Sequence, residues 1–218
     1  MRIVLFGPPG AGKGTQARLL SERHDLRHIS TGEILREAME NETPVGREAK
    51  SYVEDGELVP DDVVRRLAED AIADEDMGGF VLDGYPRTLQ QAEWLTAFLE
   101  KEDASLTAVV NLDVPDEEII ARLSKRRVHT ETGENFHLEA KPPPDHIDDA
   151  LIVQRPDDQP EAIRKRLHVY REETAPVRAY YEGRATYRSV DGTGSFEDVY
   201  GRIETVLEET AAPARAER

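Results

Sequence analysis

Short apolar runs alternate with longer amphipathic stretches along most of the chain. The clearest runs are Ile3–Phe6, Phe80–Leu82 and Val109–Val114, with weaker ones at Arg27–Ile29 and Tyr187–Val190. Nearly continuous apolar strands of this length are typical of a parallel sheet that is covered on both faces. We therefore predict an α/β fold of three layers, with a parallel sheet at its centre and helices on either side.

Between the runs, apolar residues recur at helical spacing. Each group below is expected to form the buried face of one helix. The groups are Leu89, Ala92, Leu95, Phe98 and Leu99; Ile119, Ile120 and Leu123; and Phe196, Val199, Ile203, Val206 and Leu207.

Two stretches interrupt this alternation of strands and helices. Residues 30–75 contain three helical segments without a convincing strand, and residues 127–158 are polar and rich in proline. Insertions of this size in a compact domain are usually functional. We expect a single domain over residues 1–218, with two lobes hinged on its core and a frayed tail at Ala211–Arg218.

Composition narrows the possible partners and cofactors. The chain carries 28 Lys or Arg against 45 Asp or Glu, a formal net charge of −17, which disfavours nucleic acid and anionic membranes as partners. It has no cysteine, which excludes disulfides, thiolate zinc sites and thiol catalysis. No apolar run approaches the ~20 residues of a membrane span, and the N-terminus does not read as a signal peptide. We expect a soluble, cytoplasmic protein.

The basic residues are skewed toward arginine, with 22 Arg and only six Lys. An excess of acidic residues together with few lysines resembles the composition of proteins from salt-saturated cytoplasms. Salt screens the repulsion among like charges. We therefore expect a halophilic protein.

A glycine-rich loop follows the first apolar run and opens a helical pattern. Its sequence, Gly-Pro-Pro-Gly-Ala-Gly-Lys-Gly-Thr at residues 7–15, fits a P-loop, whose backbone N–H groups and lysine hold a phosphate chain. The hydroxyl stands at Thr15, one position later than in the general pattern. The predicted nucleotide-binding residues are Gly10, Ala11, Gly12, Lys13, Gly14 and Thr15.

A carboxylate ends the apolar run at residues 80–82. Asp83 stands where P-loop folds hold Mg²⁺, often through water, and Gly84 follows it instead of the glutamate of motor-type ATPases. We predict Mg²⁺ near Asp83, bound chiefly to the nucleotide.

Several motifs together resemble the adenylate kinase family of nucleoside monophosphate (NMP) kinases. They are the P-loop, Ile-Ser-Thr-Gly-Glu-Ile-Leu-Arg (29–36), Leu-Asp-Gly-Tyr-Pro-Arg-Thr-Leu-Gln-Gln-Ala (82–92), Arg-Arg-Val-His (126–129), Gln-Arg-Pro-Asp-Asp (154–158), Ile-Arg-Lys-Arg-Leu (163–167) and Val-Asp-Gly-Thr (190–193). The resemblance extends to about residue 208. It implies a P-loop kinase fold with an NMP-binding lobe at 30–59, a lid at 125–158 and the reaction ATP + AMP ⇌ 2 ADP, with Mg²⁺ and a monomeric protein.

The resemblance also assigns roles to individual residues. It implies a catalytic set of Lys13, Arg87, Arg126, Arg155 and Arg166, since arginine grips phosphate oxygens in a planar fork. Besides the P-loop residues, ATP would contact Arg122, Arg126, Asn135, Phe136 and Gly194. AMP would contact Thr31, Arg36, Glu57, Leu58, Val59, Gly84, Tyr85, Pro86, Arg87, Gln91, Arg155 and Arg166. Thr31 and Gln91 are expected to select adenine, and the four-residue spacing of Arg87 and Gln91 predicts one shared helix face.

The lid of some relatives binds zinc through four cysteines, whereas others replace the metal with hydrogen bonds among His, Ser or Thr and Asp. His129 and Thr132 stand at the first pair of these positions, and the second pair remains open between Asp145, Asp148 and Asp149. Three scattered histidines without thiolates are more often hydrogen-bonded than metal-bound. We expect a lid without zinc.

Two alternatives remain open at this point. UMP, CMP or GMP could replace AMP as the acceptor, because base choice depends on one or two hydrogen bonds. A P-loop switch that binds nucleotide and signals is a different class, against which the arginine-rich second site argues. A purely structural protein would leave the P-loop and the Asp-Gly-Tyr-Pro-Arg motif unexplained.

Overall fold

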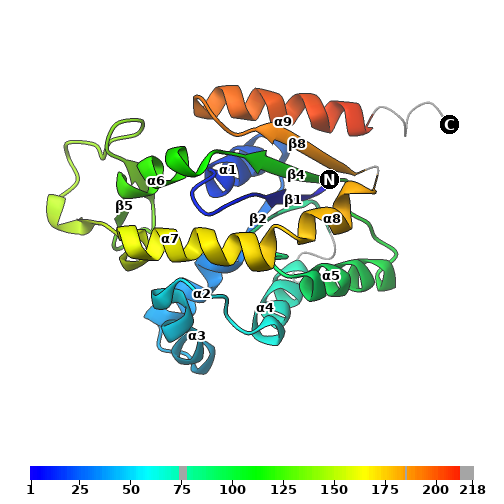
Figure 1. Cartoon of the computed structure of the whole chain (residues 1–218), viewed down its shortest axis with the longest axis horizontal. Helices are drawn as coiled ribbons and strands as arrows, with labels where there is room; N and C mark the ends of the chain where they lie inside the picture. The colour runs from blue at the N-terminus through cyan, green and yellow to red at the C-terminus, as the bar shows by residue number, and fades with distance from the viewer. Residues whose placement is uncertain (74–77, 185, 212–218) are drawn as a thin grey trace.

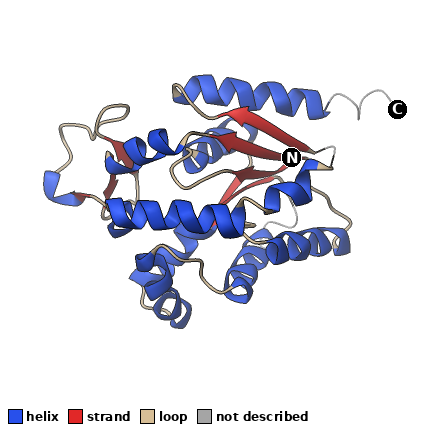
Figure 2. Ribbon diagram, viewed as in Figure 1, coloured by secondary structure: helices blue, strands red, loops and turns tan. Residues whose placement is uncertain are grey.

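A sheet of five parallel strands forms the centre of the computed structural model, which describes residues 1–73, 78–184 and 186–211 (Figures 1 and 2). Its strand order is β2-β3-β1-β4-β8, and helices cover both faces. Every strand coincides with one of the apolar runs, so the predicted three-layer α/β fold is confirmed. The strands are β1 (Arg2–Phe6), β2 (Arg27–Ser30), β3 (Phe80–Asp83), β4 (Ala108–Asp113) and β8 (Tyr187–Asp191).

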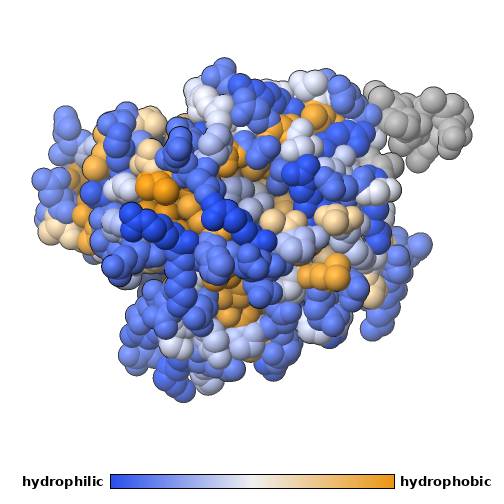
Figure 3. Space-filling view, in the orientation of Figure 1, coloured by the Kyte–Doolittle hydropathy of each residue, from blue (hydrophilic) through white to orange (hydrophobic). Residues whose placement is uncertain are grey.

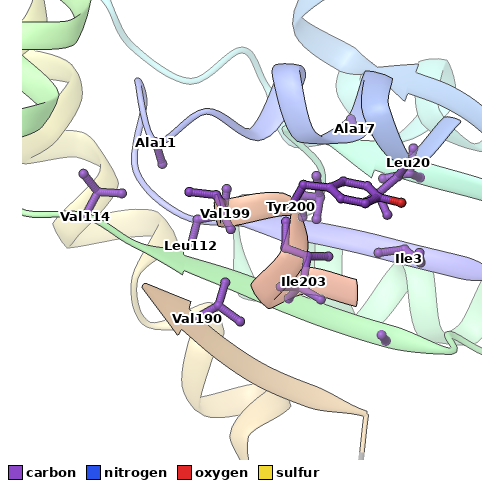
Figure 4. Packing of buried hydrophobic residues seen from close by; sticks show 14 of the residues in the cluster. Ile3, Ala11, Ala17, Leu20, Leu112, Val114, Val190, Val199, Tyr200 and Ile203 are labelled. Atoms are coloured by element: carbon purple, nitrogen blue, oxygen red, sulfur yellow. The ribbon is translucent and has the colours of Figure 1, made fainter. Parts of the chain in front are cut away.

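Alternate residues of the central strand β1 enter two separate hydrophobic cores, as the pleat of a strand requires. Ile3 and Leu5 pack on one face with α1 (Lys13–His24) and α9 (Phe196–Ala211), and Figure 4 shows this packing. Val4 and Phe6 pack on the other face with α4 (Asp61–Ala73), α5 (Leu89–Lys101) and α8 (Val177–Glu182). Burial on both faces explains why the central strands β1, β3 and β4 are mostly apolar, whereas the edge strands β2 and β8 carry polar residues such as His28 and Arg188.

The expected helix faces are confirmed in their centres and fail at three positions. Ala92, Leu95, Leu99, Ile119, Leu123, Val199, Ile203 and Leu207 are buried. Leu89, Ile120 and Phe196 are instead 49%, 37% and 39% exposed. Leu89 and Phe196 are the first residues of their helices, α5 and α9. Ile120 follows buried Ile119 on α6 (Asp116–Ser124), and neighbouring helical residues point about 100° apart.

Three helices occupy residues 30–75, as the sequence predicts: α2 (Thr31–Glu40), α3 (Pro44–Asp55) and α4. Side chains cap two of them, since Ser30 accepts from the Glu33 N–H and Thr43 from the Gly46 N–H. A Cβ at Gly46 would lie 1.9 Å from the Ala38 carbonyl oxygen, so only glycine allows α3 to approach α2 this closely. Figure 1 shows this helical pair projecting from one side of the sheet.

The stretch 127–158 contains a second sheet that the sequence did not predict. Its antiparallel strands, in the order β6-β5-β7, are β5 (Arg126–His129), β6 (Asn135–His137) and β7 (Ile152–Val153), preceded by the 3₁₀ turn η1 (Asp149–Leu151). Strands of two to four residues with charged and polar side chains show no readable alternation. In Figure 1 this small sheet lies at the end of the molecule away from the C-terminus.

A long helical segment leads back from the small sheet to the core. It consists of η2 (Pro156–Asp158), α7 (Pro160–Val169), the π-helical turn η3 (Tyr170–Thr174) and α8. Within the described residues, no helix is both long and apolar enough for a membrane crossing. The face seen in Figure 3 is mostly hydrophilic with small apolar groups. Of the predicted frayed tail, residues 212–218 lie outside the described part.

Candidate active site

A cavity of about 690 Å³ lies where the carboxyl ends of β1, β2 and β3 meet the two inserted stretches. Ligands of open parallel sheets bind at this edge. The cavity is lined by the P-loop, by residues of 30–59 and 125–158, and by α7. It therefore collects side chains from segments that are far apart in the sequence.

The P-loop wraps the N-terminus of α1 in a conformation that its glycines permit. Gly10 and Gly12 have positive φ angles of 82° and 95°, and a Cβ at Gly10 would lie 2.8 Å from Leu123 Cγ. Lys13 is the first residue of α1, and its Nζ donates to the carbonyl oxygens of Gly7 and Pro8 at 2.8 Å each. Unpaired N–H groups and the positive end of the helix dipole make such a terminus an anion site.

The charge of Lys13 is strongly affected by its surroundings. Burial lowers the pKa of its ammonium group to about 8; Asp83 opposes this shift, and Arg87, Arg166 and Arg126 add to it. A cation surrounded by other cations is stabilised by any anion that enters. The lysine is therefore suited to a phosphate chain.

Asp83 ends β3 beside the P-loop, and its Oδ2 lies 3.2 Å from the position of a Cβ on Gly14. Burial alone would raise the pKa of this carboxyl, but His28, Lys13 and Arg87 together bring the pKa below its ordinary value. It is thus an ionised oxygen donor at the cavity wall. One carboxylate next to a phosphate site fits Mg²⁺, which keeps most of its waters and binds through phosphates.

Arg126 and four further arginines also line the cavity: Arg36, Arg87, Arg155 and Arg166. Burial lowers the pKa of each of these four guanidinium groups, yet arginine keeps its charge in proteins. The mutual repulsion of these cations makes the cavity ready for polyanions. Arg87 is held by its own turn, because its Nε donates to the Gly84 carbonyl oxygen at 2.7 Å.

Two aspartates of η2 form ion pairs with the arginines. Asp158 is fully buried and accepts from Arg126 Nε and Nη2 at 2.7 and 2.6 Å. Arg166 Nη1 lies 2.8 Å from Asp157 Oδ2 and 3.4 Å from Asp158 Oδ1. Sequence reasoning had placed both aspartates in a motif without giving them a role. Only the tertiary structure shows that they are the counter-ions of the site.

The candidate base-selecting residues Thr31 and Gln91 both line the cavity. The Thr31 hydroxyl donates to the Gly84 carbonyl oxygen at 3.0 Å. The expected shared helix face of Arg87 and Gln91 is wrong, because Thr88 caps α5 and Arg87 precedes the helix. Gln91 instead reaches back, and its Oε1 accepts from the Arg87 backbone N–H at 2.8 Å.

The cavity is also lined by the remaining residues predicted to contact ATP. Arg122 donates to the carbonyl oxygens of Gly192 and Ala11, at 3.0 and 3.4 Å, and so joins α6 to the P-loop and to the turn after β8. Asn135, Phe136 and Gly194 line the same part of the wall. Phe196, which sequence reasoning used only as a core residue, also lines it. The sequence signal that could have placed Phe196 at the site is its position at the start of a predicted helix, close to Gly194.

All but one of the predicted site residues line the cavity. The exception is Tyr85, whose ring is 1% exposed in the core and whose hydroxyl donates to the Gln91 carbonyl oxygen at 3.4 Å. Glu57, Leu58 and Val59 line the wall at the end of residues 30–59, as expected from the motif.

Two histidines stabilise the turns of the small sheet in the same manner. His129 Nδ1 accepts from the backbone N–H groups of Glu131 and Thr132 at 3.2 and 3.3 Å. His137 Nδ1 accepts from those of Glu139 and Ala140 at 3.2 and 3.0 Å, and burial lowers the pKa of this ring. In each ring, Nδ1 thus serves as the acceptor for two backbone N–H groups. In the described part of the chain, no three His, Cys, Asp or Glu residues form a group that could hold a metal ion.

Comparison with known proteins identifies relatives over almost the whole chain. A family model described as adenylate kinase matches residues 5–186. The chain is 61% identical over 208 residues to the adenylate kinase of Salinibacter ruber, in a match that covers 95% of this chain and 98% of that protein. Identity is 46% over 214 residues with the adenylate kinase of Chloroherpeton thalassium and 43% over 212 residues with that of Clostridium tetani, at the same coverage. The similarity spans the sheet, both inserted stretches and the cavity.

Proposed function

The chain belongs to the adenylate kinase family, and we propose from this premise how its residues carry out the reaction. It is a nucleoside monophosphate kinase, whose reaction is the reversible transfer ATP + AMP ⇌ 2 ADP. The observation that supports our assignment of roles is the pairing of two phosphate-binding groups in one cavity. The P-loop and Lys13 form one group, and the arginine cluster forms the other.

ATP is proposed to lie along the P-loop. The backbone of Gly10–Thr15 and the Lys13 ammonium would hold its β- and γ-phosphates, and Arg126 would contact them from the lid. The base would lie against Arg122, Asn135, Phe136 and the Gly194 backbone, all of which line that end of the cavity. Arg126 would exchange Asp158 for phosphate as the lid closes.

AMP is proposed to occupy the opposite end. Its base would contact Thr31, Gln91 and the backbone of residues 57–59, and the backbone of Gly84–Arg87 would lie beneath it. Its phosphate and the transferred group would lie among Arg36, Arg87, Arg155 and Arg166. This arrangement directs an oxygen of the AMP phosphate at the γ-phosphorus of ATP.

Charge neutralisation and positioning then supply the catalysis. A bond forms between the AMP oxygen and the γ-phosphorus as the bond to the bridging oxygen of ADP breaks, and no general base is needed because the acceptor is already an anion. Lys13 and the arginines offset the charge that spreads over the transferring group. Closure of the lid would exclude water and so prevent hydrolysis.

Mg²⁺ is proposed to accompany ATP near Asp83. The ionised Asp83 carboxylate and the Thr15 hydroxyl would hold the ion through its waters, alongside the nucleotide phosphates. When bound, Mg²⁺ supplies positive charge to the β- and γ-phosphate oxygens. The lid is proposed to keep its shape without zinc, through the hydrogen bonds of His129 and His137.

We propose that the protein is a monomer, that it acts in the cytoplasm and that it maintains the balance of adenine nucleotides. The resemblance to the family supports this setting, as does the collection of both proposed phosphate-binding groups in one cavity of the chain.

The test of the proposed roles is ADP formation from ATP and Mg²⁺ with AMP, UMP, CMP or GMP supplied in turn. We expect AMP to react far faster than the other three. If another monophosphate reacts best, the assignment of Thr31 and Gln91 is refuted while the arginine roles remain. If none reacts although ATP binds, the chain would function as a nucleotide-binding switch.

A further inference from the structure

Three side chains form a closed hydrogen-bonded group next to the predicted AMP site. Asp61 Oδ2 accepts from the Thr88 hydroxyl, and Asp61 Oδ1 accepts from Gln91 Nε2, both at 2.7 Å. Thr88 Oγ1 in turn accepts from the Gln91 backbone N–H at 3.2 Å. Asp61 had no role in the sequence motifs.

The group joins two parts of the site that are distant in sequence. Asp61 is the first residue of α4, just after the Glu57–Val59 segment that lines the cavity. Thr88 is the N-cap of α5, directly after the loop that carries Arg87. Gln91 is 1% exposed, and it also lines the cavity.

Two neighbours, one a hydrogen-bond acceptor and the other a donor, fix the orientation of the Gln91 side-chain amide. A carboxylate only accepts hydrogen bonds and a backbone N–H only donates. Asp61 therefore takes the NH₂ end of the amide, and the Arg87 N–H takes the oxygen end. A rotation of the amide by 180° would place oxygen against the carboxylate and NH₂ against the N–H, so both hydrogen bonds would be lost.

A fixed amide presents its remaining hydrogen-bonding capacity in one order. One N–H and one oxygen lone pair of Gln91 are left for a ligand. Adenine carries an amino donor beside a ring acceptor, whereas guanine carries a carbonyl acceptor beside a ring donor. An amide that cannot rotate can match only one of these edges, and the mismatched base leaves polar groups unpaired.

We propose that Asp61 is a positioning residue for selection of the acceptor: it holds the Gln91 amide in the orientation that accepts a 6-amino purine and rejects a 6-oxo purine. This inference rests on the proposed contact between Gln91 and the base of AMP. Asp61 itself need not touch the nucleotide.

The test compares kcat/KM for AMP and for GMP, at saturating ATP, in Asp61→Ala, Gln91→Ala and the double variant. We expect Asp61→Ala to lower the AMP-to-GMP ratio about tenfold, which is the effect of one or two hydrogen bonds. The same substitution should cause no further loss in the Gln91→Ala background, because residues that act through one another are not additive. The KM for ATP should stay unchanged.

Asp62→Ala is the matched control. Asp62 lies beside Asp61 in the first turn of α4 but is exposed and pairs with Arg66 at 3.7 Å. Its removal takes the same charge from the helix terminus without touching Gln91, so the ratio should remain that of the parent protein. Asp61→Asn replaces Asp61→Ala as the test variant if Asp61→Ala does not fold. It keeps the size of the side chain, but its NH₂ group can face the Gln91 oxygen and so allow the reversed amide.

Each of the other possible outcomes refutes either the inference or the proposed contact on which it rests. Equal losses with AMP and GMP in Asp61→Ala would mean a structural role and refute the inference. Losses that multiply in the double variant would show that Asp61 does not act through Gln91, which also refutes it. An unchanged ratio in Gln91→Ala would refute the proposed base contact and the inference together. A loss in Gln91→Ala without one in Asp61→Ala would refute the inference alone.

Discussion

Lys13 must be charged to hold phosphate, yet its position opposes the charge. Burial among arginines lowers the pKa of its ammonium group to about 8. Below this pH the free protein carries the charge, and above it the lysine becomes neutral. A bound phosphate raises the pKa again, so ATP binding above pH 8 takes up a proton.

We therefore expect ATP affinity to weaken as the pH rises through about 8, by up to about tenfold per pH unit. Calorimetric titration of ATP between pH 6.5 and 9.5 measures this dependence. Lys13→Arg is the control, since arginine stays charged throughout this range. An equal slope in that variant would assign the pH dependence to another group.

Arg87 is the second residue whose removal is expected to be severe. Replacing it with alanine should lower kcat about 10³-fold, because no other group can replace a guanidinium at the transferring phosphoryl group. Turnover with AMP and the circular dichroism spectrum are the measurements. Arg66→Ala removes an exposed arginine of α4 and should leave both unchanged. Near-normal turnover in Arg87→Ala would contradict the role given to this residue.

The positions of residues could be predicted where a motif carries its own geometry. The P-loop puts Lys13 at a helix N-terminus wherever it occurs. The relation between Arg87 and Gln91 failed because spacing alone does not reveal where a helix begins, and the Thr88 cap decides that. Asp61, Asp157 and Asp158 act through residues distant in sequence, so no local pattern could reveal their partners.

The hairpin β5–β6 depends on its histidine turns. His129 is 8% exposed and accepts two backbone N–H groups through one ring nitrogen. Without that acceptor, the turn between the strands would lose the geometry that orients the cavity residues Asn135 and Phe136.

We expect His129→Ala to raise the KM for ATP about three- to tenfold, because the turn orients Asn135 and Phe136 on the proposed ATP side. The KM for AMP should change less, since the hairpin meets the proposed AMP site through the hydrogen bond from Arg155 Nη2 to Asn135 Oδ1 at 2.9 Å. The amides of Glu131 and Thr132 should exchange hydrogen faster. His146→Ala, an exposed histidine of the same stretch, should change neither property. Equal changes in both KM values would indicate a general loss of structure.

Among the strands, those with the most buried side chains could be predicted best from the sequence. The central strands β1, β3 and β4 could be predicted from their apolar runs, since burial on both faces favours apolar residues there. The runs of the edge strands β2 and β8 are weaker, because these strands also carry polar residues. The small sheet β6-β5-β7 lacks a hydrophobic interior of that kind, and its strands depend on turns and ion pairs instead. Its existence therefore could not be inferred from hydrophobic periodicity.

The whole molecule carries a formal charge of −17, with its cations concentrated where substrates are expected to bind. Repulsion among the surface carboxylates opposes folding, and salt screens it. We expect the melting temperature to be higher in molar KCl than in dilute buffer. A melting curve with no gain in KCl would refute the halophilic interpretation, and a series in sucrose controls for effects unrelated to charge.

The fold class, the domain core and most of the cavity lining could be predicted at this scale. The charge balance could not show how the arginines are held. Lys13 and the arginine cluster would repel one another strongly in one cavity. Asp157 and Asp158 offset this repulsion, and their motif does not indicate which arginines they pair with.

Because Asp157 and Asp158 hold Arg126 and Arg166 in the absence of nucleotide, substrate binding at the proposed sites would exchange one anion for another. The gain in free energy is the difference between a carboxylate and a phosphate partner, which is smaller than the full attraction of a bare cation. When ADP leaves, the aspartates are available to take its place on the arginines. With the proposed roles of these arginines, the same two carboxylates would limit how tightly products are retained and so favour release in both directions of a reversible reaction.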